Sequence, residues 1–175
     1  RSSFVGKLGT MVLKEESKIE KEVVTGITSS ENEAKITLKG IPDKPGIAAK
    51  IFGILANINV NVDLIVQNIT DDGKFASLTF TIPLDDQTRA VQELKKSKIK
   101  FKKIHSDNSI CKISIVGVGM KSNVGVAQKM FETLASKNIN IQVISTSEIK
   151  ISVLIDLPKK KIALNSLHKA YNLKK

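Results

Sequence analysis

The sequence predicts an α+β fold with two ferredoxin-like βαββαβ domains. Apolar residues follow strand and helix periods in the order strand, helix, strand, strand, helix, which is most of one such unit. The same order then occurs a second time. The length of 175 residues, with 41% hydrophobic content, is enough for two small domains that each have a core of their own.

An internal repeat is the strongest of these observations. Shifting the chain by 79 positions places Gly46 on Gly125 and keeps helix, asparagine and strand positions in register. The identical pairs include Ile36/Ile115, Gly40/Gly119, Gly46/Gly125, Ala48/Ala127, Lys50/Lys129, Phe52/Phe131, Leu55/Leu134, Ala56/Ala135, Asn59/Asn138 and Asn61/Asn140. This agreement indicates the duplication of one supersecondary unit.

The elements can be placed in order along each copy. In the first copy we expect a strand over Ala34–Gly40, a helix over Gly46–Ile58, strands over Val60–Ile69 and Phe75–Ile82, a helix over Asp86–Ser97 and a strand over Lys98–Ile104. In the second copy we expect a strand over Cys111–Val118, a helix over Gly125–Lys137, strands over Ile139–Ser147 and Ile149–Ile155, and a helix over Lys160–Tyr171. The sequence Asp71-Asp72-Gly73 predicts the first hairpin turn, and Ser147-Glu148 a tighter second one.

The second copy lacks a fourth strand, because only four residues follow Tyr171. An open edge beside a long apolar strand is an aggregation hazard, and the segment Glu22–Ser29 is a spare strand candidate. We therefore expect this N-terminal strand to complete the second domain, which makes that domain discontinuous. The expected division is a linker over 1–19, a first domain over 31–108, and a second domain over 20–30 plus 109–175.

Composition limits the classes of function. The formal net charge is +11, but only two cationic side chains, Arg1 and Arg89, are arginine, and aromatics make up 4%. Arginine is the residue that reads bases and grips phosphates, so nucleic acid is disfavoured as a partner. The alternation over Lys98–Lys102 is typical of a half-buried strand with a charged outer face.

The single cysteine and the two histidines do not predict a metal site. The single Cys111 is expected to be a buried thiol, and His105 and His168 to be surface residues. No apolar run is long enough to span a bilayer and no signal peptide opens the chain, so we expect a cytoplasmic protein without a membrane partner.

The loop before the first helix, IPDKPG, is the best candidate for binding chemistry. Dinucleotide and phosphate loops need glycine and lysine patterns that neither copy completes. A small zwitterion fits better, because the start of the helix at Gly46 suits a carboxylate while Asp43 could take an ammonium. From these residues alone the alternative stays open that Asp43 caps the helix and that Asn59 and Asn61 are turn residues.

Three longer runs carry a resemblance to a known family. The runs IPDKPGIAAKIFGILANINVNVDLIVQN, KISIVGVGMKSNVGVAQKMFETLASKNINIQVISTSEIKISVLID and ALNSLHKAYNL resemble the paired ACT domains of bacterial aspartokinases regulated by lysine and threonine. The resemblance covers about Val24 to Leu173, and RSSFVGKLGTMVL resembles the end of a kinase domain.

The resemblance implies a feedback sensor for the ATP-dependent phosphorylation of L-aspartate. It implies threonine and/or lysine as effectors, a homodimer through the ACT domains, and a kinase domain or α subunit as partner. ATP and magnesium would belong to that kinase domain, so this chain should need no cofactor and be inactive alone. The alternative is a free-standing ACT-type binding or assembly module without a kinase.

The resemblance also implies two effector sites, each between two ACT domains. The first would use Asp43, Gly46, Ala48 and Gln67 with Val126, Ala127, Asn140 and Ile141. The second would use Met120, Ser122, Gly125, Ser147 and Glu148 with Asn61 and Val62. The acid Asp43 has only Ser122 as its counterpart, so we expect the two loops to be alike in fold and unlike in what they bind.

Overall fold

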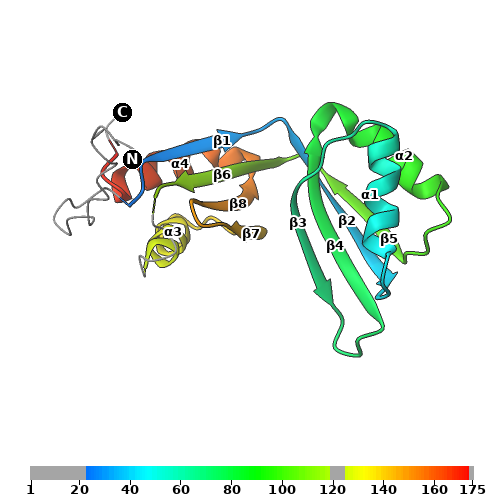
Figure 1. Ribbon diagram of the computed structural model, residues 1–175. Coiled ribbons are helices and arrows are strands. Elements are labelled where there is room, and N and C mark those ends of the chain that lie inside the picture. Colours follow the sequence, from blue (N-terminus) through cyan, green and yellow to red (C-terminus); the bar gives the residue numbers. More distant parts are fainter. Residues whose placement is uncertain (1–22, 119–124, 174–175) are drawn as a thin grey trace, which may run out of the picture.

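The computed structural model describes residues 23–118 and 125–173, which form two antiparallel sheets with two α-helices each (Figure 1). The elements of the first domain are β2 (Glu33–Pro42), α1 (Ile47–Asn57), β3 (Asp63–Ile69), β4 (Phe75–Pro83), α2 (Gln87–Lys96) and β5 (Lys103–Asp107). The elements of the second are β1 (Gly26–Ser30), β6 (Ile110–Val116), α3 (Val126–Ala135), β7 (Val143–Thr146), β8 (Lys150–Asp156) and α4 (Lys160–Ala170). A short 3-10 turn precedes α2 and another precedes α4.

The sheet orders confirm the predicted fold. The first sheet has the order β3-β4-β2-β5 and the second the order β1-β6-β8-β7, so each has the strand arrangement of a βαββαβ unit. β1 pairs antiparallel with β6 from Gly26↔Val116 to Ser30↔Lys112. The N-terminal strand therefore completes the second sheet, as predicted, although it begins at Gly26.

Each sheet is buried on the face that carries its helices. Along β2 the side chains of Ala34, Ile36 and Leu38 are fully buried, and polar side chains alternate with them. Ile51 and Leu55 of α1 pack into the same cluster at helical spacing. The equivalent residues of the second domain form a separate cluster, which includes Ile113, Ile115, Met130, Leu134 and Leu167. Two cores thus follow from one repeated pattern.

Backbone conformation repeats as closely as the sequence does. Gly46 and Gly125 precede α1 and α3 with φ of +85° and +97°. Asn59 and Asn138 follow the same helices with φ of +56° and +53°, a left-handed conformation that asparagine tolerates better than most residues. Both asparagines are therefore conserved between the copies as turn residues that end a helix.

The predicted strand over Lys98–Ile104 is wrong in position, because β5 begins at Lys103. Ile99 and Phe101 do pack against the core, but pairing with β2 starts only with the Lys102 amide, which donates to the Lys39 carbonyl at 2.8 Å. The cause is a bulge in β2 at Gly40, where the register shifts and φ is +70°. Residues before Lys102 lie beyond that bulge and cannot join the ladder.

The two histidines differ in exposure. His105 is exposed, as predicted, whereas His168 is half-buried and its Nδ1 lies buried without a hydrogen-bond partner in the described structure. The surface assignment of His168 is thus wrong. Cys111 is fully buried, as predicted, and burial raises the pKa of its thiol to about 11.

The two domains are joined by one long antiparallel ribbon. Ser30 pairs with Lys112 in β1 and β6, and Lys35 pairs with Asp107 in β2 and β5, so the register does not shift between the sheets. Only the two-residue links 31–32 and 108–109 interrupt the ribbon, and both cross between the domains side by side in Figure 1. The orientation of the domains therefore depends on how this ribbon bends.

Ion pairs and a small apolar cluster hold the junction. Lys112 of the second domain lies 2.5 Å from a carboxylate oxygen of Glu33 and 2.5 Å from one of Asp63, both in the first domain. Leu64 of β3 packs against Ile110 and Leu154 of the second domain. The junction is thus both charged and apolar.

Two glycines give opposite stability predictions. Gly53 lies inside α1 with open space around its Cα, so Gly53→Ala should raise the free energy of unfolding by about 0.5–1 kcal/mol. A Cβ at Gly117 would lie 1.7 Å from the Val23 carbonyl oxygen, so Gly117→Ala should lower the free energy of unfolding by more than about 1 kcal/mol. Urea denaturation of both variants tests this, and equal effects would contradict the packing of residue 23 beside β6.

The junction should respond to pH through Lys112. Its hydrogen bond lowers the pKa of Asp63, so this stabilisation is present above the unfolded value of about 3.9 and is lost as pH falls through the lower folded value. Burial disfavours the charged form of Lys112, but the hydrogen bonds to Asp63 and Glu33 outweigh burial and raise the pKa of Lys112. The stabilisation from the charged lysine is therefore present below its unfolded pKa of about 10.4. It is lost as pH rises through the higher pKa of Lys112 in the folded protein.

Lys112→Met should therefore destabilise the protein at pH 7, and this stability loss should shrink steadily as pH falls below about 3.9. The measurement is urea denaturation of parent and variant in a series from pH 7 to about pH 2, with exposed Lys98→Met as the control. A stability loss from Lys112→Met that stays constant over the whole series would show that the carboxylates contribute nothing.

Candidate functional site

The loop that precedes α1 is held by backbone contacts and not by a helix cap. The Asp43 amide donates to the Lys74 carbonyl at 3.0 Å, which fixes the loop to the start of β4. Gly46 has φ of +85°, which glycine adopts without strain, and α1 begins at Ile47 with no side-chain cap. Asp43 therefore does not cap the helix. The Ile47 amide donates to the Lys44 carbonyl at 3.3 Å, which leaves the next amides of the first turn to a ligand.

A cavity of about 430 Å³ lies at this loop. Its lining residues are Ile41, Pro42, Asp43, Lys44, Pro45, Gly46, Ile47, Ala48 and Gln67. The cavity thus brings together the four first-copy residues of the first predicted site, Asp43, Gly46, Ala48 and Gln67. Gln67 of β3 donates from Nε2 to Asp43 Oδ1 at 3.5 Å, a long contact that an incoming ligand can replace.

The charges around this cavity suit a zwitterion. Asp43 supplies a carboxylate, while Lys44 and the positive end of the α1 dipole favour a negative group. Its volume lies within the range typical of small-molecule sites. The arrangement can hold an ammonium and a carboxylate of one small molecule at the same time.

The second-copy residues of the first predicted site lie elsewhere in the chain. Val126 and Ala127 stand at the start of α3 and pack against the second core, as does Ile141, while Asn140 is exposed. None of these four lines the cavity at Asp43. The described part of one chain therefore presents half of that predicted site.

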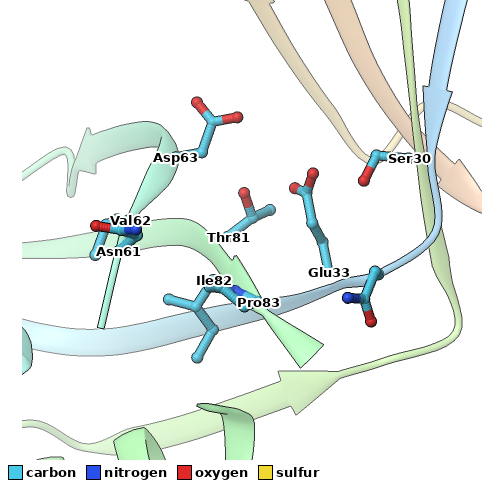
Figure 2. Close-up of a pocket in the computed structure, with 9 residues that line it drawn as sticks. Ser30, Glu33, Asn61, Val62, Asp63, Thr81, Ile82 and Pro83 are labelled. Carbon is cyan, nitrogen blue, oxygen red and sulfur yellow. The ribbon is translucent and has the colours of Figure 1, made fainter. Parts of the chain in front are cut away.

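The residues of the second predicted site are also dispersed. Met120 and Ser122 lie outside the described residues. Gly125 adopts φ of +97° before α3, and Ser147 closes the β7–β8 turn through its amide, which donates to the Lys150 carbonyl at 2.7 Å; Glu148 lies within the same turn. Asn61 and Val62 line a different cavity, at the domain junction, which none of Gly125, Ser147 and Glu148 lines (Figure 2).

Both halves of the first predicted site adjoin an outer strand. β3, which carries Gln67, and β7, which follows Asn140 and Ile141, each pair on one side only within the described residues. Isoleucines are exposed along both edges, with Ile65 at 51% and Ile144 at 45%. Such apolar edges can pair with another chain.

The sequence did not single out several residues that shape these sites. Lys44 lines the cavity beside Asp43, and the Tyr171 hydroxyl donates to the Val126 carbonyl at 2.7 Å, which ties α4 to the start of α3. Burial raises the pKa of Tyr171 to about 12. Only Lys44 could have been found from the sequence, because it lies inside the loop IPDKPG. The contact of Tyr171 could not, because it joins residues that are 45 positions apart in the sequence.

Comparisons with known proteins agree with this fold. Two ACT-domain family models match residues 36–98 and 113–171. The aspartokinase of Helicobacter pylori is 46% identical over 177 residues, covering 99% of this chain and 44% of that protein. A crystal structure of aspartokinase alpha and beta subunits matches with 47% identity and a TM-score of 0.80, covering 86% of this chain and 99% of that one.

The regulatory subunit of aspartate kinase from Thermus thermophilus is also similar. It is 39% identical with a TM-score of 0.79, and the match covers 85% of this chain and 98% of that subunit. The chain therefore belongs to the aspartokinase family, as a regulatory region built from two ACT domains. Coverage of entire regulatory chains favours this assignment over a free-standing ACT module.

Two further observations bound the assignment. The chain spans less than half the length of the curated relatives that it matches, 42% and 44% for the first two. Across residues 23–118 and 125–173, no helix is long and apolar enough to cross a membrane, and no three acidic, cysteine or histidine side chains gather as a metal site.

Proposed function

We propose that this regulatory region binds an end-product amino acid, threonine or lysine, and thereby inhibits aspartate phosphorylation. The observation that supports this most is the cavity at Asp43, where one carboxylate faces the uncapped start of a helix. Asp43 accepts hydrogen bonds from the ammonium of the effector. The amides of α1 and the side chain of Lys44 take its carboxylate.

The kinase activity belongs to a part of the enzyme beyond this chain. Curated relatives are more than twice as long, which supports a separate catalytic part that uses ATP and magnesium. This chain supplies no catalytic residue. Its contribution is a coupling free energy between effector and active conformation, commonly about 1–3 kcal/mol per site.

A homodimer completes the effector site. In this arrangement β3 of one chain lies beside β7 of its partner, which covers the exposed isoleucines of both edges. Gln67 and Asp43 of one protomer then lie near Asn140 of the partner subunit. The separation of these residues within one chain supports a site shared between two chains.

The dimer should depend on the outer strands. Ile65→Lys or Ile144→Lys places a charge on a sheet edge, so each should shift the protein from dimer to monomer in sedimentation velocity. Ile162→Lys is the control, because Ile162 is similarly exposed, at 46%, but lies on α4. A monomeric parent, or edge variants that stay dimeric, would exclude this arrangement.

Effector binding can be measured by calorimetric titration with threonine, lysine, methionine and leucine. Threonine or lysine should give saturable heat, and Asp43→Asn should weaken binding at least about tenfold by removing a charge-assisted hydrogen bond. Asp72→Asn removes an acid from the β3–β4 turn, outside the cavity, and should leave binding unchanged. Heat from none of the four amino acids, or full affinity in Asp43→Asn, would refute the proposal.

A further inference from the structure

A second cavity lies at the domain junction, away from the loop at Asp43. Its volume is about 360 Å³, and the ends of four strands form its walls (Figure 2). The lining residues are Ser30, Asn32, Glu33, Asn61, Val62, Asp63, Thr81, Ile82 and Pro83. The proposed effector function makes no use of this cavity as a whole.

Two buried oxygen atoms of its lining have no hydrogen-bond partner in the described structure. Thr81 is 0% exposed and its Oγ1 is unpaired, and Oε2 of Glu33 is buried and unpaired as well. In Figure 2 the Thr81 hydroxyl and the Glu33 carboxylate lie side by side and point to the same side of the sheet, where the Asp63 carboxylate also lies. Such groups are costly to bury unless something bonds to them.

Other hydroxyls on the helix-free faces of the two sheets do have partners. Thr37 and Thr79 lie 3.0 Å apart, oxygen to oxygen, and Ser114 and Ser152 lie 2.7 Å apart. Thr81 is on the same strand as Thr79 and has the same side-chain orientation, two residues away. Its unpaired hydroxyl is therefore particular to the cavity and not a general property of these faces.

The charge of the lining favours a cation. The lining contains two acids, Glu33 and Asp63, and no basic residue. The Lys112 ammonium lies between the two carboxylates, bound to Oε1 of Glu33 and Oδ2 of Asp63, and Lys150 also attracts Asp63. Oε2 of Glu33 is left free to accept. Two carboxylates that already bind a lysine are a poor set for a divalent metal, and a group with several N–H donors suits these acceptors better.

The remaining lining suits a short carbon chain. Val62, Ile82 and Pro83 supply apolar wall, and the volume exceeds what a bare ammonium needs. We propose that the junction cavity binds a small molecule with a primary ammonium group, whose N–H groups donate to Glu33 Oε2 and Thr81 Oγ1. Because Glu33 also binds Lys112, such a ligand acts on the contact between the domains.

The test uses the full chain and propylammonium chloride as the probe, followed by amide chemical shifts. We expect saturable shifts at Glu33, Asp63 and Thr81. Thr81→Val, which is isosteric, should weaken binding at least about tenfold by removing one acceptor of a charged donor. Thr79→Val is the matched control, because Thr79 lies outside the lining and should leave binding unchanged.

Two comparisons keep the result specific. Tetramethylammonium and potassium, at equal ionic strength, lack N–H donors and should not give the saturable shifts. Asp43→Asn should keep propylammonium binding, which separates this site from the proposed effector site. Unchanged thermal stability or an increase in Thr81→Val shows that the variant folds, since it removes an unpaired buried hydroxyl.

Three outcomes would overturn the proposal. The first is the absence of saturable shifts, which would mean that ordered water alone satisfies Thr81. The second is an equal response to potassium, and the third is full affinity in Thr81→Val.

Discussion

The structure depends on the antiparallel ribbon in which β1 pairs with β6 and β2 pairs with β5. Because β1 belongs to the second sheet, the whole first domain is inserted between two neighbouring strands of the second. The ribbon keeps one register through both sheets, and its links are only two residues long. Each link is also tied to a domain, since the Leu84 amide donates to Asn32 and the Leu157 amide to Ser109.

These ties give a physical basis for communication between the domains. Any rotation of one sheet against the other must twist the ribbon at the links or break the contacts of Lys112. A ligand that favours one arrangement by even 1.4 kcal/mol changes its equilibrium constant tenfold. Both cavities adjoin elements that such a rotation would move: one is at the loop beside β3, the other at the junction itself.

Much of the fold could be predicted from sequence, because hydrophobic periods and the repeat reflect local constraints. Both helices of each copy, both hairpins and the added N-terminal strand were predictable in this way. The position of β5 was not, since the bulge at Gly40 decides where pairing with β2 starts, and alternation of Ile99 and Phe101 continues past it. Periodicity reports which face is buried and does not report which strand is the neighbour.

The candidate sites divide along the same line. Asp43, Gly46 and Ala48 are close in sequence, and Gln67 follows by resemblance, so the first cavity was accessible to sequence reasoning. The junction cavity was not, because Glu33, Asp63 and Thr81 come from three strands, and the sequence of each strand gives no sign of the others.

The burial of Cys111 has a practical consequence. It is the only thiol of the chain, it lies on β6 next to the junction residue Ile110, and its high pKa keeps it protonated at neutral pH. A thiol reagent can reach Cys111 only when β6 opens, so the rate at which the thiol is labelled measures how often the second domain opens. The first domain contains no cysteine, so thiol labelling of the unmodified protein measures opening of the second domain alone.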